Sequence, residues 1–141
     1  MNVLIVCTGN TCRSPMGASL LRLLSESRVA GVAIDSAGVR AELGARAADE
    51  AILVMGELGI DISSHASKPV TSELLRWADY VVVVEKTVGK ELKEQFGEVD
   101  RKLYALASDV SDPFPGSTAE YRKARDQLHE LLLLWSEAFL F

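Results

Sequence analysis

Short apolar runs alternate along the chain with longer segments in which apolar residues recur at helical spacing. Residues 2–6, 32–36 and 80–84 are too short for helices and carry many β-branched side chains, so they are predicted as strands. The run over 80–84 is apolar throughout, which is typical of a strand buried on both faces of a sheet. Residues 101–106 are predicted as a fourth strand, and Ser36-Ala37-Gly38 is expected to end the second one as a turn.

The segments between these strands carry signals for the starts and ends of helices. The first predicted helix is capped by Ser14 and has Pro15 at its first position. Three further helices are predicted over 47–58, where Gly59 ends the helix, over 71–77, where Thr71 is the cap, and over 87–96. A long final helix follows a capping box formed by Ser117 and Glu120.

This alternation predicts an α/β fold, a doubly wound parallel sheet in one domain over residues 1–141. Ligands of such folds bind beyond the carboxyl ends of the strands, where the strand order reverses. The loop after the first strand and the loop over 107–116 are both expected at that edge.

Composition excludes several classes of partner. The net charge is −5 and no block of Lys or Arg occurs, so a nucleic-acid partner is not expected. No signal peptide precedes the first strand and the apolar runs are too short to span a membrane, which predicts a cytoplasmic protein. Two cysteines cannot form a secreted disulfide framework.

The segment Cys7-Thr8-Gly9-Asn10-Thr11-Cys12-Arg13-Ser14 joins the first strand to the first helix. Such a loop directs backbone N–H groups and the positive end of a helix at one point, an arrangement that binds phosphate. Gly9 provides backbone freedom and Asn10 tolerates a left-handed conformation, so the loop can curl until its amides converge.

Two side chains of this loop supply the chemistry. Arg13 can hold two phosphate oxygens in a fork. The amides, the helix end and Arg13 all favour a negative charge on the Cys7 sulfur, which is the form that attacks. Ser14 is placed to donate a hydrogen bond to that sulfur. Cys7 is therefore predicted to be a nucleophile inside a phosphate-binding loop.

Phosphoryl transfer to a cysteine needs an acid for the leaving group and then a base for water, and one carboxyl can do both. Asp112 is a candidate, because two prolines stiffen the segment that follows it, although an Asp-Pro pair by itself is more often a turn. Asp109 is expected to be a solvated carboxylate or to brace its loop. Phe114 is expected to line the cleft beside the substrate, to pack in the core, or both.

The two histidines suggest neither a base nor a metal site. His65 is expected to brace its loop and His129 to lie on the surface of the last helix. The two cysteines and the two scattered histidines lack metal-ligand spacing, so no metal or other cofactor is predicted.

The chain resembles the low-molecular-weight protein tyrosine phosphatase family in three motifs, Cys7-x5-Arg13-Ser14, Ser36-Ala37-Gly38 and Asp112-Pro113-Phe114. The motifs occur in the family's order, and the resemblance extends over essentially the whole chain. The resemblance implies a four-stranded sheet flanked by helices, and hydrolysis of a phosphorylated protein or peptide through a phosphocysteine, with inorganic phosphate as product. It implies Cys7, Arg13 and Asp112 as catalytic residues, Ser36 as a hydrogen-bonding support for Asn10, and a substrate site formed by Thr8, Gly9, Asn10, Thr11, Cys12, Ser14 and Phe114.

Cys12 has two expected roles. It shapes the loop as a small buried residue, and related phosphatases with this second cysteine suggest that it also captures an oxidised Cys7 as a reversible disulfide.

The substrate depends on two residues with opposite implications. Thr11 resembles the bacterial protein-arginine phosphatase branch, because its hydroxyl can bond a guanidinium or the hydrolytic water. Arg40, if it points into the cleft, disfavours a cationic guanidinium and suits phosphotyrosine. Family frequency places phosphotyrosine first and phosphoarginine second.

Two further alternatives are weaker. An arsenate reductase of this type needs another cysteine downstream, and none follows Cys12. A non-catalytic phosphate-binding module would be expected to lack Cys7, Arg13 or Asp112, and all three are present.

Overall fold

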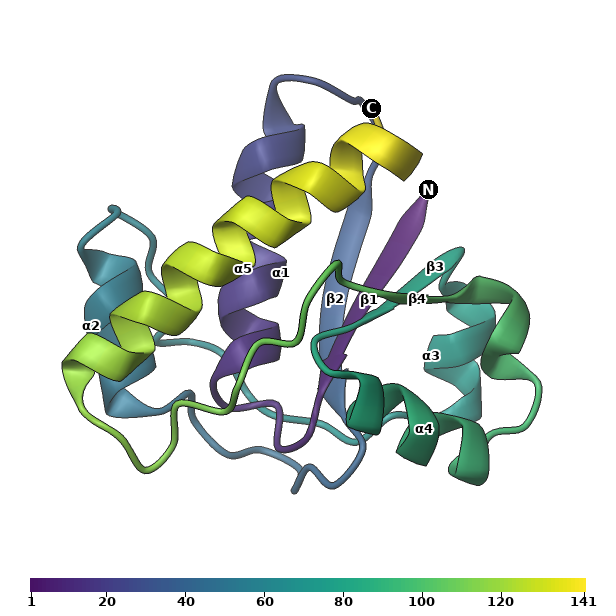
Figure 1. Ribbon diagram of the computed structural model, residues 1–141, viewed down its shortest axis with the longest axis horizontal. Coiled ribbons are helices and arrows are strands. Elements are labelled where there is room, and N and C mark those ends of the chain that lie inside the picture. The colour runs from purple at the N-terminus through teal and green to yellow at the C-terminus, as the bar shows by residue number, and fades with distance from the viewer.

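Four parallel strands form the centre of the molecule in the computed structural model, which describes residues 1–141 (Figure 1). They are β1 (Asn2–Cys7), β2 (Ala33–Gly38), β3 (Tyr80–Val83) and β4 (Leu103–Ala105), and they lie in the order β2-β1-β3-β4. The predicted doubly wound parallel sheet is confirmed.

The first strand is the point at which the winding of the sheet reverses. β1 pairs in parallel with β2 on one side and with β3 on the other, so that Val3 lies between Ile34 and Tyr80. The chain thus builds outward from β1 first in one direction and then in the other. The loop that leaves the carboxyl end of β1 therefore starts at the topological switch point, where α/β folds bind ligands.

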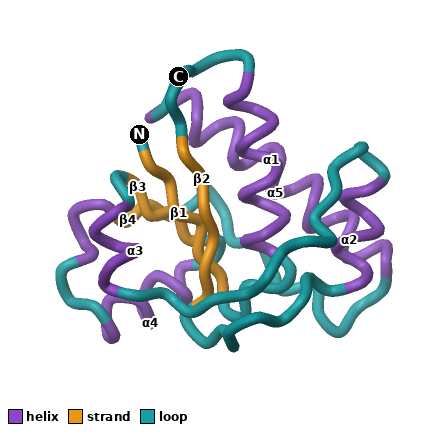
Figure 2. The backbone as a smooth tube through the Cα atoms, turned by 180° about the vertical axis from the view of Figure 1, so that it is seen from behind, coloured by secondary structure: helices purple, strands orange, loops and turns teal.

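Helices cover both faces of the sheet. On one face lie α1 (Arg13–Glu26), α2 (Asp49–Gly56) and α5 (Thr118–Phe139), and on the other lie α3 (Ser72–Trp77) and α4 (Lys86–Gln95) (Figure 2). None of these helices combines the length and the apolar composition that crossing a membrane requires.

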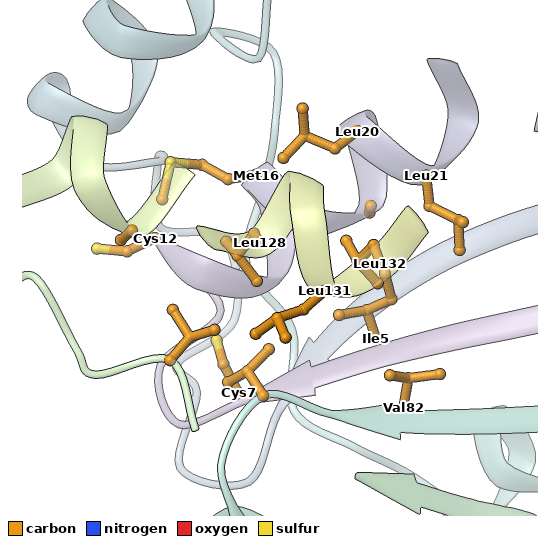
Figure 3. Close-up of a cluster of buried hydrophobic side chains, with 14 of the residues drawn as sticks. Ile5, Cys7, Cys12, Met16, Leu20, Leu21, Val82, Leu128, Leu131 and Leu132 are labelled. Atoms are coloured by element: carbon orange, nitrogen blue, oxygen red, sulfur yellow. The ribbon is translucent and has the colours of Figure 1, made fainter. Parts of the chain in front are cut away.

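Alternate residues of β1 point into two separate hydrophobic cores, as the strand period requires. Val3 and Ile5 belong to the larger core, while Leu4 and Val6 belong to the smaller core beneath α3 and α4. The labelled side chains of Figure 3 show how α5 closes the larger core over β1 and α1, with the contributing residues Ile5, Met16, Leu20, Leu128, Leu131 and Leu132.

Local capping signals predicted two helix starts correctly. The Thr71 side chain accepts a hydrogen bond from the backbone N–H of Leu74, and the Ser117 side chain accepts one from that of Glu120. Gly59 follows α2 with a φ of 75°, a conformation that suits glycine at the end of a helix.

Other boundaries were wrong. The first helix begins at Arg13, so Ser14 does not cap it and Pro15 is its third residue, still within the turn that lacks N–H partners. Ser36-Ala37-Gly38 is not a turn, because these residues continue β2 in register with β1. A 3-10 turn over Val99–Lys102 delays the start of β4 to Leu103.

Candidate active site

The loop between β1 and α1 curls around the buried side chain of Asn10. Asn10 adopts the left-handed conformation, with a φ of 56°. Its side-chain Nδ2 donates hydrogen bonds to Ser14 Oγ at 2.7 Å and to Ser36 Oγ at 2.9 Å, and its Oδ1 accepts one from the backbone N–H of Lys68 at 3.0 Å. Three separate segments of the chain therefore hold the curl of the loop.

His65 supports the same turn from outside. Its Nε2 lies 2.7 Å from the backbone oxygen of Asn10, and since a carbonyl only accepts, this ring nitrogen is the donor. The histidine braces the loop, as expected from the sequence, and it makes no hydrogen bond with Cys7.

Gly38, the last residue of β2, permits a close approach between this strand and the loop. A Cβ on this residue would lie 2.4 Å from the carbonyl oxygen of Thr8 and 2.9 Å from the backbone nitrogen of Asn10. Neither neighbour is the end of a flexible side chain, so only glycine fits. The turn predicted for Ser36-Ala37-Gly38 does not include this role, although a glycine at the end of a strand often marks such an approach.

Cys7 is the last residue of β1, and its side chain points into the curl. The residue is 2% exposed. The backbone N–H of Asn10 donates to its sulfur at 3.3 Å, and the hydroxyl of Ser14 lies 2.8 Å away. Ser14 thus uses its hydroxyl inside the loop, which explains why it does not cap the helix.

Arg13 enters the loop from the first turn of α1 and is also buried, with 3% of its side chain exposed. Its Nη1 donates to the carboxylate of Glu85 and to the backbone oxygen of Val110, the latter at 2.8 Å. Its Nη2 lies 3.4 Å from Thr8 Oγ1 and 4.0 Å from Asp112 Oδ2. The guanidinium thus connects the phosphate-binding loop to the loop that carries the candidate acid.

That second loop is held in place at Asp109 and Val110. The backbone N–H of Lys86 donates to Asp109 Oδ1 at 3.0 Å, so Asp109 braces the loop as expected. The backbone N–H of Val110 donates to the backbone oxygen of Val84, the residue after β3, at 2.9 Å. Asp112 then projects its carboxyl group toward the mouth of the site with 48% of its side chain exposed.

The two loops enclose a cleft of about 220 Å³. Phe114 lies at its rim and is 66% exposed, so the expectation that it packs in the core is wrong. The lining residues are Cys7, Thr8, Gly9, Thr11, Cys12, Arg13, Asp112 and Phe114. Asn10 and Ser14, which were expected to contact substrate, lie fully buried behind this surface.

Arg40 does not point into the cleft. Its guanidinium forms a bidentate ion pair with the carboxylate of Glu91 on α4, with N–O distances of 2.7 to 3.0 Å. Only its backbone touches the loop, through an N–H that donates to Thr8 at 2.9 Å. The condition under which Arg40 would oppose a cationic substrate is therefore not met.

Cys12 lines the cleft on the side of the last helix. Its sulfur is 3.5 Å from the hydroxyl of Tyr121 and 3.7 Å from that of Thr11. Burial raises the pKa of the Cys12 thiol, although the hydrogen bond with Tyr121 acts in the other direction. Burial and the bond with Cys12 also raise the pKa of Tyr121. Both cysteines are free.

Comparison with known proteins gives matches along the whole chain. A family model described as low molecular weight phosphotyrosine protein phosphatase matches residues 2–139. A protein-arginine-phosphatase of Bacillus subtilis (strain 168) is 37% identical over 139 residues, which cover 94% of this chain and 92% of that protein.

Solved structures agree with these matches. A YwlE arginine phosphatase superposes with a TM-score of 0.93 at 35% identity, covering 98% of this chain and 95% of that one. That structure is of a mutant in which serine replaces a cysteine, and its active-site serine is phosphorylated. A low molecular weight protein tyrosine phosphatase of T. tengcongensis superposes with a TM-score of 0.92 at 36% identity, covering 99% of each chain.

Proposed function

The chain belongs to the low molecular weight phosphotyrosine protein phosphatase family, and from that premise we propose that it hydrolyses phosphoarginine in proteins through a phosphocysteine on Cys7. Membership makes it a protein phosphatase, whose substrates are phosphorylated proteins and whose product is inorganic phosphate. The choice of phosphoarginine reverses the order expected from the sequence, which placed phosphotyrosine first.

The observation that carries this choice is the composition of the cleft wall. Thr11 lines the cleft beside Cys7, and its hydroxyl can accept a hydrogen bond from a guanidinium N–H. Arg40, the residue that argued against a cationic substrate, is bound to Glu91. The relatives support the same choice, because two curated proteins at 37% and 38% identity are named protein-arginine-phosphatases.

In the first half of the proposed reaction, the Cys7 sulfur donates an electron pair to phosphorus as the bond from phosphorus to the leaving nitrogen breaks. Asp112 protonates that nitrogen, so arginine leaves without a negative charge. The loop amides and Arg13 stabilise the equatorial phosphate oxygens. The solved relative with a phosphorylated active-site serine supports a covalent step of this kind.

In the second half, the carboxylate of Asp112 removes a proton from water, and the water oxygen attacks phosphorus. The bond from phosphorus to sulfur breaks, which returns the Cys7 thiolate and releases inorganic phosphate. All of these groups belong to residues 1–141, which we take as a single catalytic domain that needs no cofactor.

Phosphotyrosine hydrolysis is the second candidate. Phe114 stands exposed at the rim of the cleft, where its ring can stack on the ring of a phosphotyrosine. A phosphoarginine side chain has no aromatic ring for such a contact. Relatives named tyrosine phosphatases also match most of the chain, among them a protein of Ralstonia nicotianae at 31% identity.

The deciding measurement is kcat/KM on a phosphoarginine peptide and a phosphotyrosine peptide of the same sequence, for the wild type and Thr11→Ile. We expect the wild type to prefer phosphoarginine and Thr11→Ile to lose that preference, because an isoleucine side chain offers no acceptor. A preference for phosphotyrosine in both proteins would overturn the assignment. Cys7→Ser is the control that abolishes turnover on both peptides.

A further inference from the structure

Glu85 contacts the guanidinium of Arg13, and the function described so far assigns it no role. It follows the last residues of β3 and is the N-cap residue of α4, at the carboxyl edge of the sheet. Its carboxylate accepts a hydrogen bond from Arg13 Nη1 and is partly buried, with 26% of the side chain exposed. Seventy-two positions separate the two residues in the sequence.

The N–H groups of Arg13 divide into two edges. Both hydrogens of Nη1 are used, because Nη1 donates to Glu85 and to the backbone oxygen of Val110. On the opposite edge, Nη2 makes one long hydrogen bond of 3.4 Å to Thr8 Oγ1 and lies 4.0 Å from Asp112 Oδ2, while Nε has no hydrogen bond with the protein. The edge formed by Nε and Nη2 is therefore the one left for a bidentate bond to phosphate.

Which edge faces the cleft depends on the rotation of the guanidinium plane. Val110 offers one acceptor to Nη1, but a single hydrogen bond leaves the plane free to turn about it. Glu85 adds a second acceptor on the same nitrogen, and two bonds to one nitrogen define the orientation of a planar group.

From this geometry we propose that Glu85 is a positioning residue that turns the Nε and Nη2 edge of Arg13 toward the substrate phosphate. The inference rests on the proposed function only for the role of Arg13 as the phosphate ligand. An alternative role for Glu85 is simple charge compensation, since a buried guanidinium without a partner is costly. That role depends on the charge of Glu85, whereas the positioning role depends on its acceptor oxygen.

Two substitutions separate these roles, because Glu85→Gln and Glu85→Ala remove the same charge and only Gln keeps an acceptor for Nη1. We would measure the Kd of inorganic phosphate by calorimetry, and kcat and KM on p-nitrophenyl phosphate, for both variants. Thermal unfolding checks that each variant is folded. Glu94→Gln is the matched control, since it removes an exposed charge from the same helix.

We expect Glu85→Gln to keep kcat within about threefold of the wild type. Glu85→Ala should bind phosphate about tenfold more weakly than Glu85→Gln, and its kcat should be lower than that of Glu85→Gln by a similar factor. This is the size of effect expected for a lost hydrogen bond to a charged group. Equal phosphate affinity and equal kcat in the two folded variants would overturn the proposal and leave charge compensation as the role.

A second background tests whether the effect passes through Arg13. In Arg13→Lys the ammonium has no plane to orient, so Glu85→Ala and Glu85→Gln should no longer differ. A difference of the same size in that background would also overturn the proposal. Failure of the proposed function would give a different result. A wild type that does not hydrolyse phosphoarginine would still bind inorganic phosphate, so the phosphate affinities of Glu85→Gln and Glu85→Ala could still be compared.

Discussion

Gly38 at the end of β2 approaches Thr8 so closely that a Cβ on the glycine would lie 2.4 Å from the Thr8 carbonyl oxygen. This contact joins the second strand to the phosphate-binding loop, where the backbone N–H groups must converge. The neighbouring pairs Cys7–Val39 and Thr8–Arg40 bond through their backbones at 3.0 and 2.9 Å. The segment after β2 is thus a rigid wall against which the loop is shaped.

Gly38→Ala should therefore damage catalysis more than folding. The loop must move to make room for the methyl group, and a displacement near 1 Å at a catalytic loop costs about 100-fold in rate. Overpacking should lower the free energy of unfolding by about 1–3 kcal/mol. Steady-state kinetics and urea unfolding measure the two effects.

Gly56→Ala is the matched control for that substitution. Nothing lies within 4 Å of the Cβ that it adds, and the residue ends α2 without a positive φ. Its kcat should be unchanged, and its stability should be equal to or above that of the wild type because alanine is the better helix former. Similar kinetics for the two glycine variants would contradict the role given to Gly38.

Much of this site could be predicted from local sequence. The strand before Cys7, the small and flexible residues after it and the helix behind Arg13 are adjacent in the chain, so their pattern reveals a loop that binds an anion. The position of Asp112 also follows from topology, because the loops after parallel strands meet at one edge.

The rest depends on contacts between distant segments, which leave no local pattern. The amide of Lys68 reaches Asn10 across 58 positions, and Glu85 reaches Arg13 across 72. Ser14 shows how such contacts override a local signal, because a serine before a proline and an apolar run looks like a helix cap. In the structure its hydroxyl instead forms hydrogen bonds with the Cys7 sulfur and with Asn10 Nδ2.

Asp112→Ala should lower kcat strongly only when the leaving group needs a proton. A general acid contributes about 10²–10⁴-fold, and a phosphoarginine peptide should show a loss in that range. p-Nitrophenyl phosphate should lose much less, because nitrophenolate leaves without protonation. The measurement is kcat/KM for both substrates in the same buffer.

The control for that experiment is Asp109→Asn, which changes the nearest acidic neighbour in the same loop. Asp109 accepts a hydrogen bond from the N–H of Lys86 and so supports the loop rather than the leaving group. Any loss in Asp109→Asn should be the same for both substrates. An equal loss on both substrates in Asp112→Ala would remove Asp112 as the acid.

Cys12 should react with thiol reagents only at high pH in the folded protein. Cys7→Ser leaves Cys12 as the single cysteine, so its alkylation by iodoacetamide can be followed alone. Burial raises the pKa of the Cys12 thiol, so the thiolate forms at a higher pH in the folded variant than in the same variant unfolded in urea. The alkylation rate should therefore also rise at a higher pH in the folded variant. The prediction would be contradicted if the alkylation rate of the folded variant rose at the same pH as that of the unfolded variant, or at a lower pH.

The ion pairs between α2 and α5 should make stability fall in acid. Glu57 at the end of α2 accepts hydrogen bonds from Arg122 and Arg125, and Arg122 makes the largest contribution in lowering the pKa of its carboxyl to about 2. The folded pKa lies below that of an unfolded glutamate, about 4.3, so the stabilisation is complete above that value. It is lost as the pH falls from about 4.3 toward 2, when protonation removes the charge that the arginines bind.

Glu57→Gln should therefore have a lower Tm than the wild type at pH 7, and the difference should shrink as the pH is lowered from 5 to 3. Thermal unfolding at pH 7, 5, 4 and 3 measures it, and 1 M NaCl should reduce the difference at pH 7 because the pair is open to solvent. Glu130→Gln, which removes an exposed charge from α5, should show no such trend. A Tm difference for Glu57→Gln that stays constant from pH 7 to 3 would mean that packing, rather than the charge of Glu57, joins these two helices.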